Sequence, residues 1–171
     1  MIYLRSTLFF LGMVITAPVA TFFGLLVAPL PFPLRYKVIS QWAIFVIWWL
    51  KITCNLNYRV TGLENLQQIN NGIIFSKHQS AWETMAFQSI FPPQVWVLKQ
   101  SLLWIPIFGW GLALLKPIAI DRGAGRKALQ QVVKQGTDRL QSGIWVVIFP
   151  EGTRLPPGEK KKFAGGGAVL A

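Results

Sequence analysis

The chain of 171 residues is poor in the residue types that bind metals or form disulfides. It has one cysteine, Cys54, and one histidine, His78. A single cysteine excludes an intramolecular disulfide and a cysteine-based zinc site, and a single histidine excludes the HExxH pattern of metalloproteases. The sequence also has no GxSxG, P-loop or GxGxxG motif. It therefore offers neither a serine-hydrolase elbow nor a glycine-rich loop for phosphates or dinucleotides.

Acidic residues are also scarce. Six Asp and Glu stand against seventeen Lys and Arg, so the formal net charge is +11. Only 13% of the residues are charged, whereas 53% are hydrophobic. Average domains carry about 25% charged residues, so this composition argues against an ordinary soluble enzyme, and the apolar content excludes a disordered chain. Apolar bulk with excess positive charge fits a protein that lies against an anionic membrane, and nucleic acid is the alternative partner for such a charge.

Two apolar stretches near the N-terminus favour the membrane. Leu8–Leu30 is 23 residues without a charge, long enough to cross a hydrocarbon core of about 30 Å, although Pro18 predicts a kink. A signal peptide is the alternative, but its apolar region is normally only about 7–15 residues. Val38–Leu50 contains three tryptophans and has 13 residues. It is too short to span alone and is predicted to be interfacial or re-entrant.

The basic residues around these stretches predict their topology. Arg5, Arg35, Lys37 and Lys51 flank the two segments. Because positive residues stay on the cytoplasmic side, we expect a hairpin that enters and leaves the membrane from the cytoplasm, with a true span of the first segment as the alternative. The predicted division of the chain is a membrane-embedded part, residues 1–53, and a second domain, residues 54–171.

Short mixed elements follow Cys54. Apolar runs predict strands, and two longer segments with helical periodicity predict helices. The expected strands are Leu56–Val60, Gly72–Ser76, Gln94–Lys99, Pro117–Asp121 and Ile144–Phe149, and the expected helices are Ser80–Phe91 and Gly125–Gln141. Strands alternating with helices indicate an α/β fold, in which a mixed, mostly parallel sheet is flanked by helices and preceded by the hydrophobic hairpin.

The first candidate site is the segment from Lys77 to Glu83, between an expected strand and an expected helix. If His78 lies on non-helical backbone before the helix, its ring can fold toward Glu83, and the carboxylate can fix the Nδ1–H tautomer and leave Nε2 free as a base. The structural alternative is that Ser80 and Glu83 form a capping box, which needs no catalytic role.

Two further clusters also lie at expected strand ends, where α/β folds place their sites. Phe149–Arg154 follows the most apolar strand, and Asp121 and Arg122 follow another, while Lys99 ends a third. Lys99, Arg122 and Arg154 together would suit a phosphate. A strand-ending turn and ordinary surface solvation are the alternatives for these residues.

In these residues the sequence resembles the 1-acylglycerol-3-phosphate acyltransferases, the lysophosphatidic acid acyltransferases of the glycerolipid acyltransferase superfamily. Their first motif, His-x4-Asp, matches His78 to Glu83, and their third, Phe-Pro-Glu-Gly-Thr-Arg, is complete at Phe149–Arg154. Their second, an apolar strand ending in Asp-Arg, matches Ile118–Arg122. A Lys followed by a Pro and a Gly matches Lys99, Pro106 and Gly109. The resemblance covers about Gly62 to Ala171, and the N-terminal hydrophobic region looks like that of bacterial members.

The resemblance implies direct acyl transfer from acyl-CoA or acyl-carrier protein to the 2-hydroxyl of 1-acylglycerol 3-phosphate, giving phosphatidic acid at the cytoplasmic face of a bacterial inner membrane. It makes His78 the general base and Glu83 the group that orients it and balances its charge. It implies no metal or bound cofactor. The implied substrate-binding residues are Lys99, Arg122, Glu151, Gly152, Thr153 and Arg154, with Glu151 ordering its loop or pairing with an arginine.

Three departures qualify the resemblance. Glu83 replaces the commoner Asp. Ala164 and Gly165 lie where relatives often have a basic residue, which predicts a smaller contribution of that loop to anion binding. The family sequence continues beyond Ala171, so the family's fourth motif is expected to be missing here. The open alternatives are another acceptor, such as glycerol 3-phosphate or a different lysophospholipid, and a non-catalytic basic protein that binds membranes.

Overall fold

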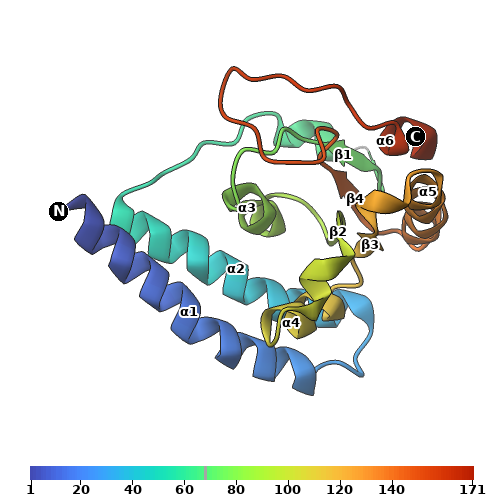
Figure 1. Ribbon diagram of the computed structural model, residues 1–171. Helices are drawn as coiled ribbons and strands as arrows, with labels where there is room; N and C mark the ends of the chain where they lie inside the picture. Colours follow the sequence, from blue (N-terminus) through green and yellow to red (C-terminus); the bar gives the residue numbers. More distant parts are fainter. Residues whose placement is uncertain (68) are drawn as a thin grey trace.

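A four-stranded parallel sheet organises the second part of the chain (Figure 1). The computed structural model describes residues 1–67 and 69–171. The strand order is β1-β4-β2-β3, and each neighbouring pair is parallel. The strands are β1 (Ile73–Phe75), β2 (Gln94–Lys99), β3 (Ile118–Ile120) and β4 (Trp145–Ile148). The predicted α/β fold is confirmed, and the described strands are all parallel rather than mixed.

One predicted strand is wrong. Leu56–Val60 is irregular chain that leads from the hairpin to a short 3-10 helix, Leu63–Leu66. Its residues are mostly exposed. The alternating apolar side chains therefore do not pack against a core, and the backbone does not pair with a neighbouring strand.

The helices after the hairpin connect the strands. Besides 3-10 segments at Gln100–Trp104 and Arg122–Ala124, they are α3 (Trp82–Ile90), α4 (Phe108–Leu114), α5 (Arg126–Gln141) and α6 (Gly166–Leu170). α3 and α5 lie within the ranges expected from the sequence. α4 and α6 were not expected, because both are rich in glycine and short, and glycine disfavours a helix.

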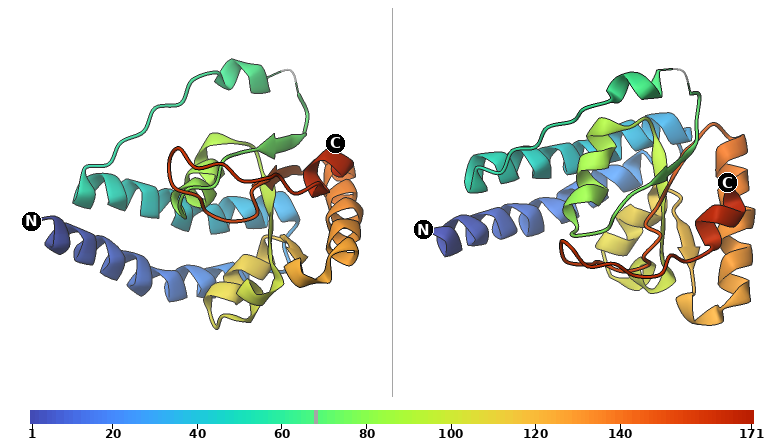
Figure 2. Two further views of the ribbon diagram at one scale, coloured as in Figure 1. Left: turned by 45° about the horizontal axis from the view of Figure 1, so that its top comes forward. Right: turned by 90° about the horizontal axis from the view of Figure 1, so that it is seen from above.

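The two faces of the sheet carry separate apolar clusters. On one face Val95, Ile118 and Val146 pack with side chains from α5 and α6. On the other, Trp96 and Val147 pack with Tyr36 of the hairpin and Phe87 of α3. The hairpin and α3 therefore cover one face, and α5 and α6 cover the other, as the views in Figure 2 also show.

The N-terminal hairpin consists of α1 (Ile2–Leu26) and α2 (Phe32–Cys54), which pack against each other along the chain (Figure 1). α1 continues through Pro18. α2 has 23 residues, so the prediction of a short element over Val38–Leu50 was wrong. The predicted segment ended at the flanking charged residues. α2 nevertheless includes Arg35, whose Nη1 donates to the Ala28 carbonyl at 2.9 Å.

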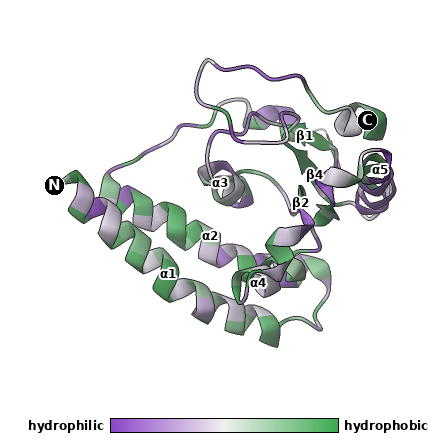
Figure 3. Ribbon diagram, in the orientation of Figure 1, coloured by the Kyte–Doolittle hydropathy of each residue, from purple (hydrophilic) through white to green (hydrophobic). Residues whose placement is uncertain are grey.

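Both helices of the hairpin are long and apolar enough to cross a membrane. α1 is the more exposed of the two, with a mean hydropathy of 2.1 over its most apolar window and only 6% of that window buried. Figure 3 shows the apolar colouring along both helices and the hydrophilic colouring of the loop between β4 and α6. The length and composition of the hairpin favour an association with a membrane.

Candidate active site

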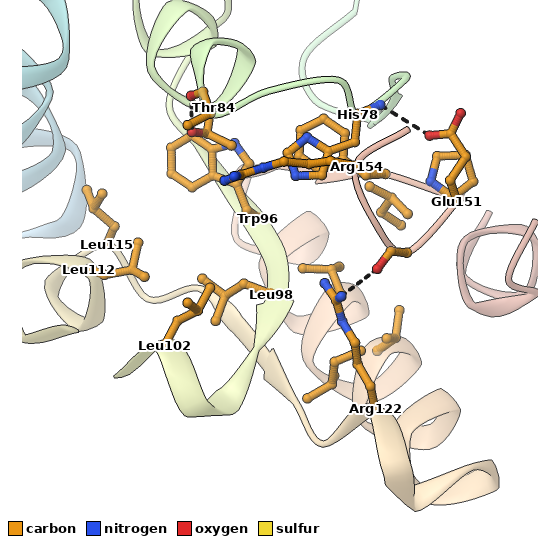
Figure 4. Close-up of a pocket in the computed structure, with 18 of the residues that line it drawn as sticks. His78, Thr84, Trp96, Leu98, Leu102, Leu112, Leu115, Arg122, Glu151 and Arg154 are labelled. Carbon is orange, nitrogen blue, oxygen red and sulfur yellow. Dashed lines mark hydrogen bonds between the residues drawn. The ribbon is translucent and has the colours of Figure 1, made fainter. Parts of the chain in front are cut away.

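A cavity of about 870 Å³ lies between the hairpin and the carboxyl ends of the strands. Its inner part is apolar, and Figure 4 shows Leu98, Leu102, Leu112 and Leu115 on that side. Polar and basic side chains line it as well. These are His78, Arg122, Glu151, Arg154, Lys161 and Lys162. The cavity can therefore hold a long apolar chain next to an anionic group.

His78 lies on irregular backbone between β1 and α3, as predicted. Its ring stacks on that of Phe149, with centroids 4.1 Å apart and planes inclined by 18°. Burial lowers the pKa of His78 below its ordinary value of 6.5; the nearby Glu83 charge acts in the opposite direction, and Arg154 and Arg122 lower the pKa further. The imidazole is therefore mainly neutral at neutral pH, which is the form that accepts a proton.

Glu83 does not make the predicted hydrogen bond to His78. Its carboxylate instead accepts the backbone N–H groups of Gln79 (2.6 Å) and Ser80 (3.0 Å) and the Ser80 hydroxyl (2.9 Å). Ser80 Oγ in turn accepts the N–H of Trp82. This is the capping arrangement left open above, and it fixes the backbone that carries His78. The imidazole Nδ1 is buried and makes no hydrogen bond within the part of the chain that the structure describes.

These hydrogen bonds also determine the ionisation of Glu83. Burial acts to raise the pKa of its carboxyl. The hydrogen bonds from its own N–H, from Gln79 and from Ser80 outweigh burial and hold the pKa below its ordinary value of 4.5. Glu83 is therefore a buried anion close to His78, where it would favour an imidazolium through space.

The loop after β4 closes over His78 from the other side. Glu151 is buried, and its Oε2 accepts the backbone N–H of His78 at 3.1 Å (Figure 4). Arg122 Nη1 donates to the carbonyl of Gly152. Gly152 has a φ of +68°, a conformation that glycine adopts without the strain of a side chain. Glu151 thus orders this loop, which was one of its two predicted roles, and the described contacts include no ion pair between it and an arginine.

Two of the predicted binding residues lie elsewhere. Lys99 lines a separate hollow of about 270 Å³ together with Trp104 and Asp121, so the prediction that it joins Arg122 and Arg154 was wrong. Lys99 is the exposed last residue of β2, beyond Trp96, Val97 and Leu98, which line the main cavity. Thr153 is exposed and does not line the cavity.

The family model described as Acyltransferase matches residues 57–171. The chain belongs to this acyltransferase family.

Its relatives include two proteins named 1-acyl-sn-glycerol-3-phosphate acyltransferase. The one from Pseudomonas aeruginosa is 47% identical over 170 residues, and the one from Saccharomyces cerevisiae is 30% identical over 157. The alignments cover 98% and 89% of this chain but 66% and 50% of those proteins. This acyltransferase chain thus spans between half and two thirds of their length.

A solved structure has the same fold. The crystal structure of the 1-acyl-sn-glycerophosphate (LPA) acyltransferase PlsC from Thermotoga maritima superposes with a TM-score of 0.76 at 21% identity. The match covers 99% of this acyltransferase chain and 68% of that one. It supports the arrangement of hairpin and sheet described above.

The structure adds residues to the site that the sequence did not single out. The hairpin supplies part of the cavity wall, through Met13, Ala17, Thr21, Gly24, Ile39 and Trp42. Lys161 and Lys162 also line the cavity, in the same loop as Ala164 and Gly165. The Lys160–Lys162 run, which begins six residues after Arg154, is the sequence signal that could have identified them.

Proposed function

We propose that the chain transfers an acyl group from a thioester donor to the 2-hydroxyl of 1-acylglycerol 3-phosphate. The observation that carries the proposal is that His78 lines one cavity that combines an extensive apolar lining with the basic side chains of Arg122 and Arg154. A lysophospholipid has the same division, with an acyl chain on one side of its reacting hydroxyl and a phosphate on the other. The names of the relatives agree with this acceptor.

His78 would act as general base in this reaction. Its neutral imidazole takes the proton of the 2-hydroxyl while the oxygen attacks the thioester carbon. The carbon–sulfur bond then breaks, and the departing thiolate takes the proton back from the imidazolium. Glu83 stabilises the imidazolium through its charge and positions the backbone of His78. The thioester itself supplies the leaving group, so this direct transfer calls for no metal or cofactor beyond acyl-CoA or acyl-carrier protein.

Arg122 and Arg154 would bind the acceptor phosphate. Both lie close enough to His78 for their charges to lower its pKa, and both line the cavity. The phosphate of the acceptor is carried on the carbon next to the one that bears the reacting hydroxyl, so it must lie near the base. The planar guanidinium can contact two phosphate oxygens at once, which a lysine cannot do.

The hairpin would place this site at a membrane. Acceptor and product are lipids, and the exposed apolar surface of α1 gives the protein a means of entering the bilayer in which they reside. The basic residues that flank the hairpin favour the cytoplasmic face of a bacterial inner membrane, where the donors are available.

Acyl transfer by the purified chain in mixed micelles, with a radiolabelled donor, tests the acceptor. We expect 1-acylglycerol 3-phosphate to be acylated in preference to glycerol 3-phosphate and to lysophosphatidylcholine or lysophosphatidylethanolamine. Equal or faster transfer to one of the other acceptors would show that the proposed substrate is wrong. Absence of transfer to every acceptor, by a folded chain, would contradict the activity itself.

A further inference from the structure

Lys161 and Lys162 form a second basic group in the cavity, apart from the two arginines. Both lysine side chains are exposed and line the cavity, whereas Lys160, their neighbour, does not line it. Neither of the two makes a hydrogen bond or ion pair among the contacts of the described residues. They lie in the loop between β4 and α6, which Figure 3 shows as a hydrophilic segment.

The backbone of this loop is held beside the site at three points. The N–H of Leu155 donates to the His78 carbonyl at 2.9 Å, and the N–H of Ala164 donates to the Pro150 carbonyl at 2.8 Å. Between them, Lys77 Nζ donates to the carbonyl of Glu159 at 2.7 Å. The lysine run follows Glu159 directly, so its position relative to His78 is fixed by these bonds rather than left to a free loop.

The basic side chains lining the cavity outnumber those that one acceptor phosphate requires. Arg122 and Arg154 suffice for the acceptor, whose phosphate must lie next to the reacting hydroxyl. The other substrate also carries a phosphate, since both acyl-CoA and acyl-carrier protein attach the acyl group through phosphopantetheine. A pantetheine arm separates that phosphate from the thioester. It therefore needs a cation that lines the same cavity at another position, and Lys161 and Lys162 lie seven and eight residues beyond Arg154 on the loop after β4.

We propose that Lys161 and Lys162 bind the phosphate of the phosphopantetheine arm of the acyl donor. The proposal rests on the proposed function, because it assigns a donor to the same cavity. Two lysines suit this phosphate, which is a phosphodiester in acyl-carrier protein and part of a diphosphate in acyl-CoA, because their point charges can neutralise either form without planar two-point recognition.

Kinetics with three donors that share one acyl chain test the assignment: acyl-CoA, acyl-carrier protein and S-acyl pantetheine, which lacks the phosphate. We expect Lys161→Ala/Lys162→Ala to raise the KM for acyl-CoA and acyl-carrier protein about tenfold or more, the loss typical of a charge-assisted contact. The KM for S-acyl pantetheine and that for the acceptor should stay unchanged. An effect on acyl-CoA alone would place the lysines on its nucleotide phosphates and overturn the proposal.

The matched control is Lys160→Ala, which removes the same charge from the same loop outside the cavity. It should leave the KM for all three donors unchanged. An equal rise in KM in this variant would show that the lysines act only through general electrostatic attraction, and would overturn the proposal. Arg154→Ala should show the opposite pattern, with a raised acceptor KM. If the lysine variant raises the acceptor KM instead of the donor KM, the lysines belong to the acceptor and the proposal is wrong.

A binding measurement separates this proposal from the proposed activity. The thioether S-hexadecyl-CoA cannot transfer its chain, so its affinity for the full chain can be measured by calorimetry whether or not the protein catalyses transfer. We expect about tenfold weaker binding to the double lysine variant than to the wild type and to Lys160→Ala. Equal affinity for all three proteins would overturn the assignment.

Discussion

His78 combines a reactive position with an environment that keeps it neutral. Burial against Phe149 and the charges of Arg154 and Arg122 lower its pKa, while Glu83 limits the effect. At neutral pH the imidazole is therefore mainly neutral and has a nitrogen free to accept a proton. The lowered pKa also makes the imidazolium that forms a stronger acid than an ordinary one. In the proposed reaction the arginines would therefore have two roles, since they would attract the phosphate and disfavour premature protonation of His78.

The ionisation of His78 can be measured directly, because it is the one histidine in the sequence. In NMR titrations of the ¹⁵N-labelled imidazole, we expect a midpoint below 6.5. Arg154→Ala should move the midpoint upward, since a nearby positive charge is lost. A midpoint at or above 6.5 in the wild type would contradict the described environment.

Glu83 should influence both stability and His78. In Glu83→Gln the acceptor of the Gln79 and Ser80 N–H groups loses its negative charge, so we expect a loss of about 1–3 kcal/mol from these weakened hydrogen bonds. The imidazole midpoint should also fall further, because the Glu83 charge raises the pKa of His78. Chemical unfolding and the same NMR titration measure the two effects. An unchanged His78 midpoint would restrict Glu83 to its structural role.

The stabilisation that Glu83 provides should depend on pH in one direction. Its pKa is lower in the folded chain than the ordinary 4.5, so the unfolded state binds the proton more readily. The contribution is therefore complete above 4.5 and is lost as the pH falls through the depressed folded value. Glu83→Gln should remove this part of the acid sensitivity in the same unfolding series.

Elements with a simple pattern were predicted well from the sequence, and those shaped by their neighbours were not. β2 and β4 read as continuous apolar runs because parallel strands are covered on both faces. The irregular path of Leu56–Val60 and the full length of α2 depend on contacts that no local pattern contains. For the same reason strand ends located the candidate site, yet they did not show that Lys99 lines a separate hollow.

α4 illustrates an element that tertiary packing imposes on an unfavourable sequence. A Cβ on Gly109 would overlap the backbone carbonyl of Leu103, which cannot rotate away as a side chain could. We expect Gly109→Ala to destabilise the fold by about 1–3 kcal/mol, although alanine is the better helix former. Gly165→Ala is the control, since nothing lies near the position of its Cβ. Equal unfolding midpoints for the two variants would contradict the described packing.

The hairpin and the sheet are packed together and share one cavity. The hairpin contributes Tyr36 to the core of the sheet and forms part of the cavity wall, so it is more than an attached anchor. The exposed apolar side chains of the hairpin and the net charge of +11 of the whole chain favour binding to a bilayer in two different ways. The cavity lies between these helices and the strand ends, where a lipid can reach it.

Vesicle flotation distinguishes these two contributions. We expect binding to both neutral and anionic phospholipid vesicles, with the additional binding to anionic ones abolished at about 1 M salt, where charges are screened over a few ångströms. Binding to neutral vesicles should resist the salt, because apolar insertion does not depend on screening. Complete release from both kinds of vesicle by salt would show that the hairpin does not insert.

The role of His78 is decided by one comparison of rates. Acyl transfer from a thioester to 1-acylglycerol 3-phosphate should fall at least about 10²–10⁴-fold in His78→Ala, the usual contribution of a general base, while the protein level and the unfolding midpoint stay near those of the wild type. Transfer within a few-fold of the wild-type rate by a folded His78→Ala protein would contradict the assignment of His78 as the base.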